Sequence, residues 1–125
     1  MIAATNAKAG TLLRLATIQQ DGWELEDGEA RHAESPDTFE IPAIEERLSL
    51  RPGQLVKLIF RIALRDEAGV ESEAAERMWV ELKSKSDFFY SGTLDNDAYS
   101  TKEFRAGLSV VFQPRHVIQI YRERT

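Results

Sequence analysis

Apolar and polar residues alternate from residue 54 onward, and this alternation predicts β-strands over most of the second half of the chain. In the segment 54–64, one side of the pleat is apolar and carries Val56, Leu58, Phe60, Ile62 and Leu64. The opposite side carries Lys57 and Arg61. A period of two is typical of a half-buried strand. Pro52-Gly53, just before it, predicts a type II turn.

The same pattern predicts four further strands, at 78–83, at 88–94, before Pro114 and at 117–121. Gly92 indicates either a β-bulge or a close approach of two backbones. The segment 70–76 is acidic and contains alanines, so we expect a loop or a single helical turn there. A short helical turn is expected over 99–105.

Five short antiparallel strands without a long helix favour an α+β, mainly β fold. Bending or closing such a sheet removes the exposed edges that a flat sheet would leave. We therefore expect a small SH3-like antiparallel barrel or a strongly bent sheet, covered by an N-terminal segment. An OB-like or open-sheet α+β arrangement is the second possibility. A length of 125 residues fits a single domain, 1–125.

The outer side of the predicted sheet needs a cover. Residues 49–125 form the expected barrel-like core, and its outer side carries large side chains: Ile59, Trp79, Phe89 and Val111. A contiguous group of this kind is seldom exposed on a monomer. Residues 1–48 are the nearest cover, and a second copy of the chain is the competing one. The chain is thus expected to be a monomer or a homodimer.

Within the N-terminal segment two local structures compete. Residues 11–25 admit an amphipathic helix or a hairpin that turns at Asp21-Gly22, and the Asp-Gly pair favours the hairpin. Further along, prolines at two positions bias the preceding residues toward extended backbone. We expect an extended piece over 38–41, with Phe39 and Ile41 as its anchors.

The composition excludes several kinds of chemistry. The chain has no Cys, which removes disulfides, thiolate metal sites and thiol nucleophiles, and its two His residues are far apart. Its net charge of −5 disfavours a general nucleic-acid binder, since phosphate contacts need a basic surface. No pattern of a membrane span or secretory signal is present, so a cytoplasmic, bacterial-type protein without a membrane contact is expected.

Charge is distributed unevenly along the chain. Residues 21–46 hold ten acids and one base, a net charge of −9, whereas the remaining residues hold eleven acids and fifteen bases, a net charge of +4. This stretch either folds back against the basic remainder or presents a negative surface to a basic partner. In the second case Asp27, Glu29 and Glu34 are candidate binding residues.

No constellation of residues points to catalysis, a metal or a cofactor. The sequence contains neither a nucleophile motif nor a calcium-loop pattern. Trp79 shares the polar side of its strand with charged residues, and with Arg61 and Arg115 it forms a candidate binding patch. Arg77, placed on the Met78 side of the strand, and His116, in the turn before the last strand, complete the candidate set.

Several strings in the last 75 residues or so resemble a known family. They are Glu76-Arg77-Met78-Trp79-Val80-Glu81, Gly92-Thr93-Leu94-Asp95-Asn96, Gly107 with Val110 and Phe112, and His116-Val117-Ile118. Together they resemble a family of small bacterial domains of unknown function, related to the immunity-protein-like domains of toxin–immunity loci. The relatives commonly have a proline where this chain has Ala98. The resemblance implies a compact β-rich module without an assigned catalytic residue, sometimes a neutraliser of a secreted toxin.

These observations predict a non-enzymatic protein-binding module that uses an acidic surface toward an unidentified, basic protein partner. An immunity-type protein is its more specific form. The alternative is a β-barrel that contacts a small molecule or single-stranded RNA through Trp79, Tyr90 and the basic residues of the strands.

Overall fold

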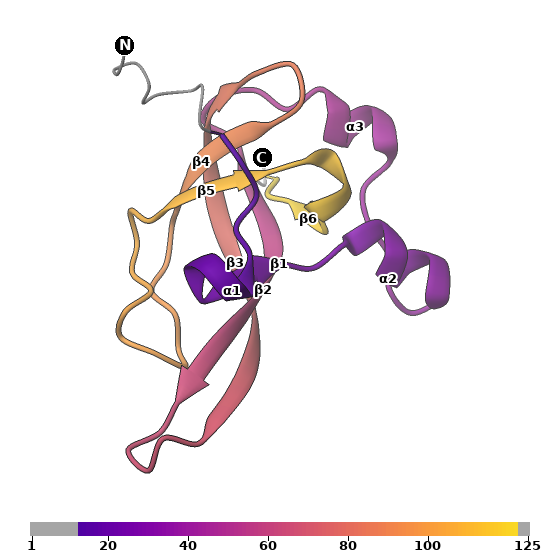
Figure 1. Cartoon of the computed structure of the whole chain (residues 1–125). Helices are drawn as coiled ribbons and strands as arrows, with labels where there is room; N and C mark the ends of the chain where they lie inside the picture. Colours follow the sequence, from indigo (N-terminus) through magenta and orange to yellow (C-terminus); the bar gives the residue numbers. More distant parts are fainter. Residues whose placement is uncertain (1–12, 123–125) are drawn as a thin grey trace.

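The computed structural model describes residues 13–122 and contains one antiparallel sheet. Four strands follow one another as a meander: β2 (Leu55–Arg65), β3 (Glu71–Lys85), β4 (Tyr90–Leu94) and β5 (Ser109–Phe112). Two short strands, β1 (Trp23–Leu25) and β6 (Gln119–Ile120), pair with the other edge of β2. The sheet curls into a half-barrel (Figure 1). The predicted α+β, mainly β fold with a strongly bent sheet is confirmed.

The concave side of the sheet holds the hydrophobic core, as the alternation predicts. Its fully buried members include Val56, Leu58 and Phe60 of β2, Val80 and Leu82 of β3, and Phe112 of β5. Three aromatic rings pack together at one end of the core. The centroid of the Trp23 ring lies 5.5 Å from that of Phe60 and 5.5 Å from that of Phe104. The strand β1 thus brings the N-terminal segment into the core.

Gly92 marks a close approach of two backbones, as predicted. The pairing of β3 with β4 shifts by one residue between Leu82 and Ser84, next to Gly92. A Cβ at Gly92 would lie 2.2 Å from the carbonyl oxygen of Glu81 and 3.0 Å from Val80 Cγ1. Only glycine fits at this position between the paired strands.

The hairpin of β2 and β3 extends well beyond the rest of the sheet (Figure 1). The prediction of a loop or a helical turn over 70–76 is therefore wrong, because β3 begins at Glu71 and pairs with β2 from there to Glu81. Ion pairs across the arm, Arg61 with Glu73 at 2.9 Å and Arg65 with Glu71, support strand pairing where the residues themselves have low strand propensity.

Residues 13–48 of the N-terminal segment contain three short helices: α1 (Ile18–Asp21), α2 (Gly28–Glu34) and α3 (Ile44–Leu48). The favoured hairpin is wrong in the described residues 13–25, because β1 pairs with β2. Asp21-Gly22 ends α1 instead, with Gly22 in the left-handed region (φ 80°).

The helical turn expected over 99–105 is also wrong. That segment consists of turns, and Glu76 holds it by accepting backbone N–H bonds from Tyr99 (2.8 Å) and Ser100 (2.6 Å). Burial raises the pKa of Glu76, but the hydrogen bonds from Ser100 and Tyr99 outweigh it, so the pKa lies below its usual value.

Candidate protein-binding surface

The N-terminal segment covers part of the outer side of the sheet. Ile59 points to this side yet is only 2% exposed. Its carbonyl accepts a hydrogen bond from the Glu26 N–H (3.0 Å), and Gly28 at the start of α2 packs so closely on Ile118 that a Cβ would come within 2.8 Å of its Cγ2. The expected intramolecular cover is therefore present in this chain.

Phe39 anchors the segment between α2 and α3, as predicted. The extended backbone predicted over 38–41 is wrong at Thr38 and Phe39, because the N–H groups of both residues donate to the Ser35 carbonyl and close a turn. The Phe39 ring lies below two guanidinium groups, that of Arg31 at 5.0 Å and that of Arg77 at 5.5 Å from the ring centroid. His32 is bonded to the backbone of the same residue, with Nδ1 2.7 Å from the Phe39 carbonyl oxygen. Arg77 pairs in register with Ile59 and shares the outer side with Trp79, so its placement on the Met78 side is wrong.

The arginines of the predicted binding patch are engaged within the molecule. Arg61 makes ion pairs with Glu24 of β1 (2.8 Å) and Glu73 of β3 (2.9 Å). Arg115, in the 3₁₀ helix η3 (Pro114–His116), lies 3.4 Å from Asp27, which caps α2. Arg61 and Arg115 therefore fasten the N-terminal segment to the sheet, and the structure does not present them with Trp79 as a free basic patch.

Much of the acidic stretch folds back on bases elsewhere in the chain. Five ion pairs join it to arginines outside residues 21–46: Asp21 with Arg14, Glu24 with Arg61, Asp27 with Arg115, Glu29 with Arg47, and Glu46 with Arg122. Hydrogen bonds from Arg14 and Thr17 lower the pKa of Asp21. Two predicted binding residues, Asp27 and Glu29, are thus structural contacts. The third, Glu34, is exposed at the end of α2.

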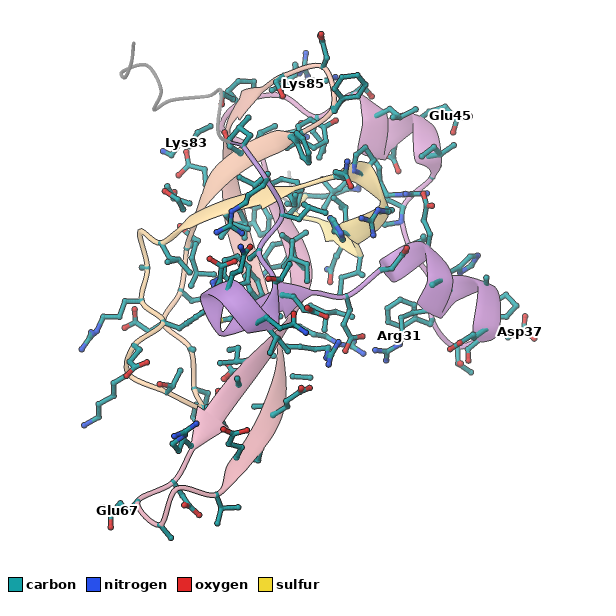
Figure 2. All side chains as sticks on the ribbon, in the orientation of Figure 1. Arg31, Asp37, Glu45, Glu67, Lys83 and Lys85 are labelled. Atoms are coloured by element: carbon teal, nitrogen blue, oxygen red, sulfur yellow. The ribbon has the colours of Figure 1, made fainter. Side chains whose placement is uncertain are left out.

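Four acids of the stretch make no ion pair with any described residue, and they define what we call the acidic surface: Glu34, Asp37, Glu40 and Glu45. All four are exposed, and the segment 33–45 that carries them contains no Lys or Arg. Asp37 and Glu45 project from the side of the molecule that lies away from the sheet (Figure 2). Four exposed acids therefore remain without an ion pair among the described residues after the internal pairs have formed.

Arg47 connects the acidic segment to the sheet, a role that the sequence pattern did not predict. Its side chain is buried, and it donates to the Pro42 carbonyl (2.8 Å), the Pro114 carbonyl (3.1 Å) and Glu29 (2.5 Å). Its own carbonyl accepts from the buried Tyr90 hydroxyl (2.7 Å). The available signal was the position of Arg47 at the end of the acidic stretch, directly after Glu45 and Glu46.

Replacing Arg47 by methionine is expected to lower the free energy of unfolding by about 2 kcal/mol, because the Pro42 carbonyl loses its donor and Glu29 loses its partner. The Pro114 carbonyl keeps the N–H of Val117 as a donor. Glu29 is partly exposed, so water offsets part of this loss. The matched control is Arg51→Met at an exposed position, with an expected change below about 0.5 kcal/mol. Urea unfolding measures both, and equal changes at the two positions would contradict the role of Arg47.

Trp79 lies in an open groove on the outer side. It is half-buried, with the Lys57 ammonium 4.8 Å above its ring and the exposed Tyr121 ring edge-on at 5.9 Å. Ile41 and Pro42 of the N-terminal segment line the same groove. Tyr90, which the RNA-binding alternative would use for stacking, is instead buried in the core. Of the two aromatic residues that the RNA-binding alternative needs for stacking, only Trp79 is therefore accessible.

His116 is buried in η3. Its Nδ1 accepts a hydrogen bond from the backbone N–H of Gln113 (2.9 Å), so the imidazole stabilises the turn. Burial lowers the pKa of His116 to about 4, with the Arg115 charge acting in the same direction and Asp27 acting against both. Such a neutral, bonded ring is a structural group and does not contribute to the acidic surface.

Among residues 13–122, no group of three or more His, Asp or Glu side chains could hold a metal ion, and no helix is long and apolar enough to cross a membrane. Comparison with known protein families, with curated proteins and with solved structures found no match.

Proposed function

We propose that this protein is a non-enzymatic protein-binding module whose acidic surface contacts a basic surface of its partner. The observation that carries the proposal is the set of four exposed acids left without an ion pair among the described residues, on a segment that has no base. Exposed charges of one sign raise the rate of encounter with an oppositely charged protein and select against partners of the same sign.

Rigidity of the segment supports the same proposal. Arg47 and Arg115 hold α2 through Glu29 and Asp27, and Arg61 holds β1 through Glu24. The segment that carries the acidic surface is therefore ordered before a partner arrives. A preformed surface loses less conformational freedom on binding than a disordered one. In its more specific form the proposal is an immunity-type protein that occludes a basic toxin surface, as the family resemblance implies.

Neutralising the acidic surface is expected to weaken partner binding. In the variant E34Q/D37N/E40Q three exposed charges are lost, each worth about 0.5 kcal/mol, so the affinity should fall about tenfold at low salt. The matched control E67Q/D95N/E103Q removes the same net charge from exposed acids elsewhere on the chain, and should bind within about twofold of wild type.

Immobilised wild-type, variant and control proteins are compared for the proteins that they retain from the source cell, and the affinity of the retained partner is then measured at two salt concentrations. Added salt should weaken the wild-type complex because it screens exposed charges. Equal binding by all three proteins, or an affinity that is independent of salt, would contradict the proposed function.

A further inference from the structure

Apolar side chains gather where α3 meets the turn between β3 and β4. Leu48 of α3 is 53% exposed and Phe88 of the turn is 76% exposed, although both are large and apolar. They line a groove whose other walls are formed by Phe89, Tyr90 and Pro114. We call this the α3 groove. Exposed apolar side chains that share a concavity are typical of a binding site.

The geometry of α3 explains why this groove faces solvent. Arg47 points inward, whereas Ile44 and Leu48 are four residues apart on the helix and share a face. The exposed fraction of Ile44 is 40%. The apolar face of the helix is thus turned away from the core.

Lys85 fixes the two walls of the groove to each other. Its ammonium donates to the Leu48 carbonyl at the end of α3 (2.8 Å) and lies 5.4 Å from the centroid of the Tyr90 ring. Figure 2 shows Lys85 at the same end of the molecule as Glu45. The turn itself is closed by the Ser86 N–H, which donates to the Phe89 carbonyl (2.8 Å). The groove is therefore formed before any ligand binds.

The charges beside the groove select its occupant. Asp87 lines the groove and Glu45 belongs to α3, and neither makes an ion pair with a described residue. The one base in the lining, Lys85, keeps its charge, but its ammonium is directed at the Leu48 carbonyl, and the two acids together outweigh it. A second copy of the chain would bring its own Glu45 and Asp87 against these acids, and an anionic membrane would be repelled in the same way. A cationic occupant is favoured.

We propose that the α3 groove binds a cationic amphipathic segment of the partner protein, with apolar side chains against Leu48 and Phe88 and Lys or Arg side chains toward Glu45 and Asp87. Apolar anchors in a preformed groove supply affinity, and the flanking charges supply orientation. This inference rests on the proposed function, because it places the apolar anchor point beside the acidic surface.

The probe is a fluorescent 18-residue peptide of Leu and Lys at helical spacing, and its affinity is measured by anisotropy. The variant L48S/F88S should bind it at least tenfold more weakly than wild type, because two apolar contacts are lost. The matched control V70S/Y99S replaces two exposed apolar residues elsewhere and should bind within about twofold of wild type. Thermal unfolding of each variant verifies that it is folded.

Two comparison peptides separate the sources of affinity. A scrambled peptide of the same composition, which has no apolar face, should bind at least tenfold more weakly, and a peptide with Glu in place of Lys should not bind detectably. Equal binding of the Glu peptide would overturn the inference, since charge would not select the occupant. Equal binding of the scrambled peptide, or failure of wild type to bind the Lys peptide, would overturn it as well.

The test separates this inference from the proposed function. If L48S/F88S binds the peptide as wild type does while E34Q/D37N/E40Q binds the retained partner weakly, the groove is wrong and the acidic surface stands. If sedimentation shows a dimer that L48S/F88S abolishes, the occupant is a second copy and the inference is overturned. Loss of peptide binding in L48S/F88S alone, with a monomer throughout, supports it.

Discussion

Replacing Gly92 by alanine is expected to lower the free energy of unfolding by at least about 3 kcal/mol, or to prevent folding. The added Cβ would lie 2.2 Å from the Glu81 carbonyl oxygen, a backbone atom that cannot rotate away. The strands β3 and β4 would have to separate at the centre of their pairing, which would disturb buried neighbours such as Val80.

Gly107→Ala is the matched control, because it makes the same chemical change at a position with open space. Nothing lies within 4 Å of a Cβ there, and the only penalty is the left-handed backbone (φ 101°), about 1 kcal/mol. Urea unfolding of both variants gives the comparison. A Gly92 variant no less stable than the Gly107 variant would show that the two backbones do not approach each other closely at Gly92.

Acid should destabilise the protein through His116, well before most carboxylates are protonated. Because its pKa is lowered to about 4 in the folded state against 6.5 for the free ring, the unfolded chain binds the proton more readily. The stability associated with the neutral ring is complete above pH 6.5 and is lost as the pH falls toward 4. The expected loss by pH 4 is about 3 kcal/mol.

His116→Asn is the variant that isolates this effect, since its side-chain oxygen can accept the Gln113 N–H but does not titrate. The variant is expected to be less stable at pH 7 and to lose less stability than wild type between pH 6.5 and pH 4. His32 remains in both proteins, so its contribution cancels. Parallel pH profiles for the two proteins would contradict a buried, neutral His116.

The features of the fold that could be predicted from the sequence are those set by local pattern. The alternation in 54–64 places Val56, Leu58 and Phe60 in the core, where they are fully buried. Gly53 has a φ of 96°, which is the turn conformation that Pro52-Gly53 predicts. The close approach at Gly92 is local in the same sense, because a glycine inside an aromatic strand is typical of a bulge or of two backbones in contact.

The features that could not be predicted depend on partners distant in sequence. Residues 71–76 have low strand propensity, yet they pair with 60–65 because β2 offers them a template and Arg61 and Arg65 offer charges. Trp23–Leu25 pairs with Phe60–Ile62, some forty positions further along the chain, and this contact displaces the local hairpin that Asp21-Gly22 favours. Long-range pairing overrides local preference in both cases.

The candidate site shows the same division. The net charge of residues 21–46 predicts that some acids face solvent, and it also permits others to fold back. Whether an acid faces solvent or forms an internal ion pair depends on distant bases such as Arg61 and Arg115. Their partners, Glu24 and Asp27, lie 37 and 88 residues away in the sequence. The sequence therefore predicts an acidic surface but cannot separate Glu34, which is exposed, from Asp27 and Glu29, which hold the fold together.

The most direct test of the account is whether the N-terminal segment lies on the sheet in the free protein. Nuclear Overhauser effects report proton pairs closer than about 5 Å, and Gly28 and Phe39 provide two such reporters. A segment that lies on the sheet gives cross-peaks from the Gly28 α protons to the Ile118 γ2 methyl and from the Phe39 ring to the Arg77 side chain. Absence of both sets in a monomeric sample, with Ile59 accessible to solvent, would contradict this arrangement.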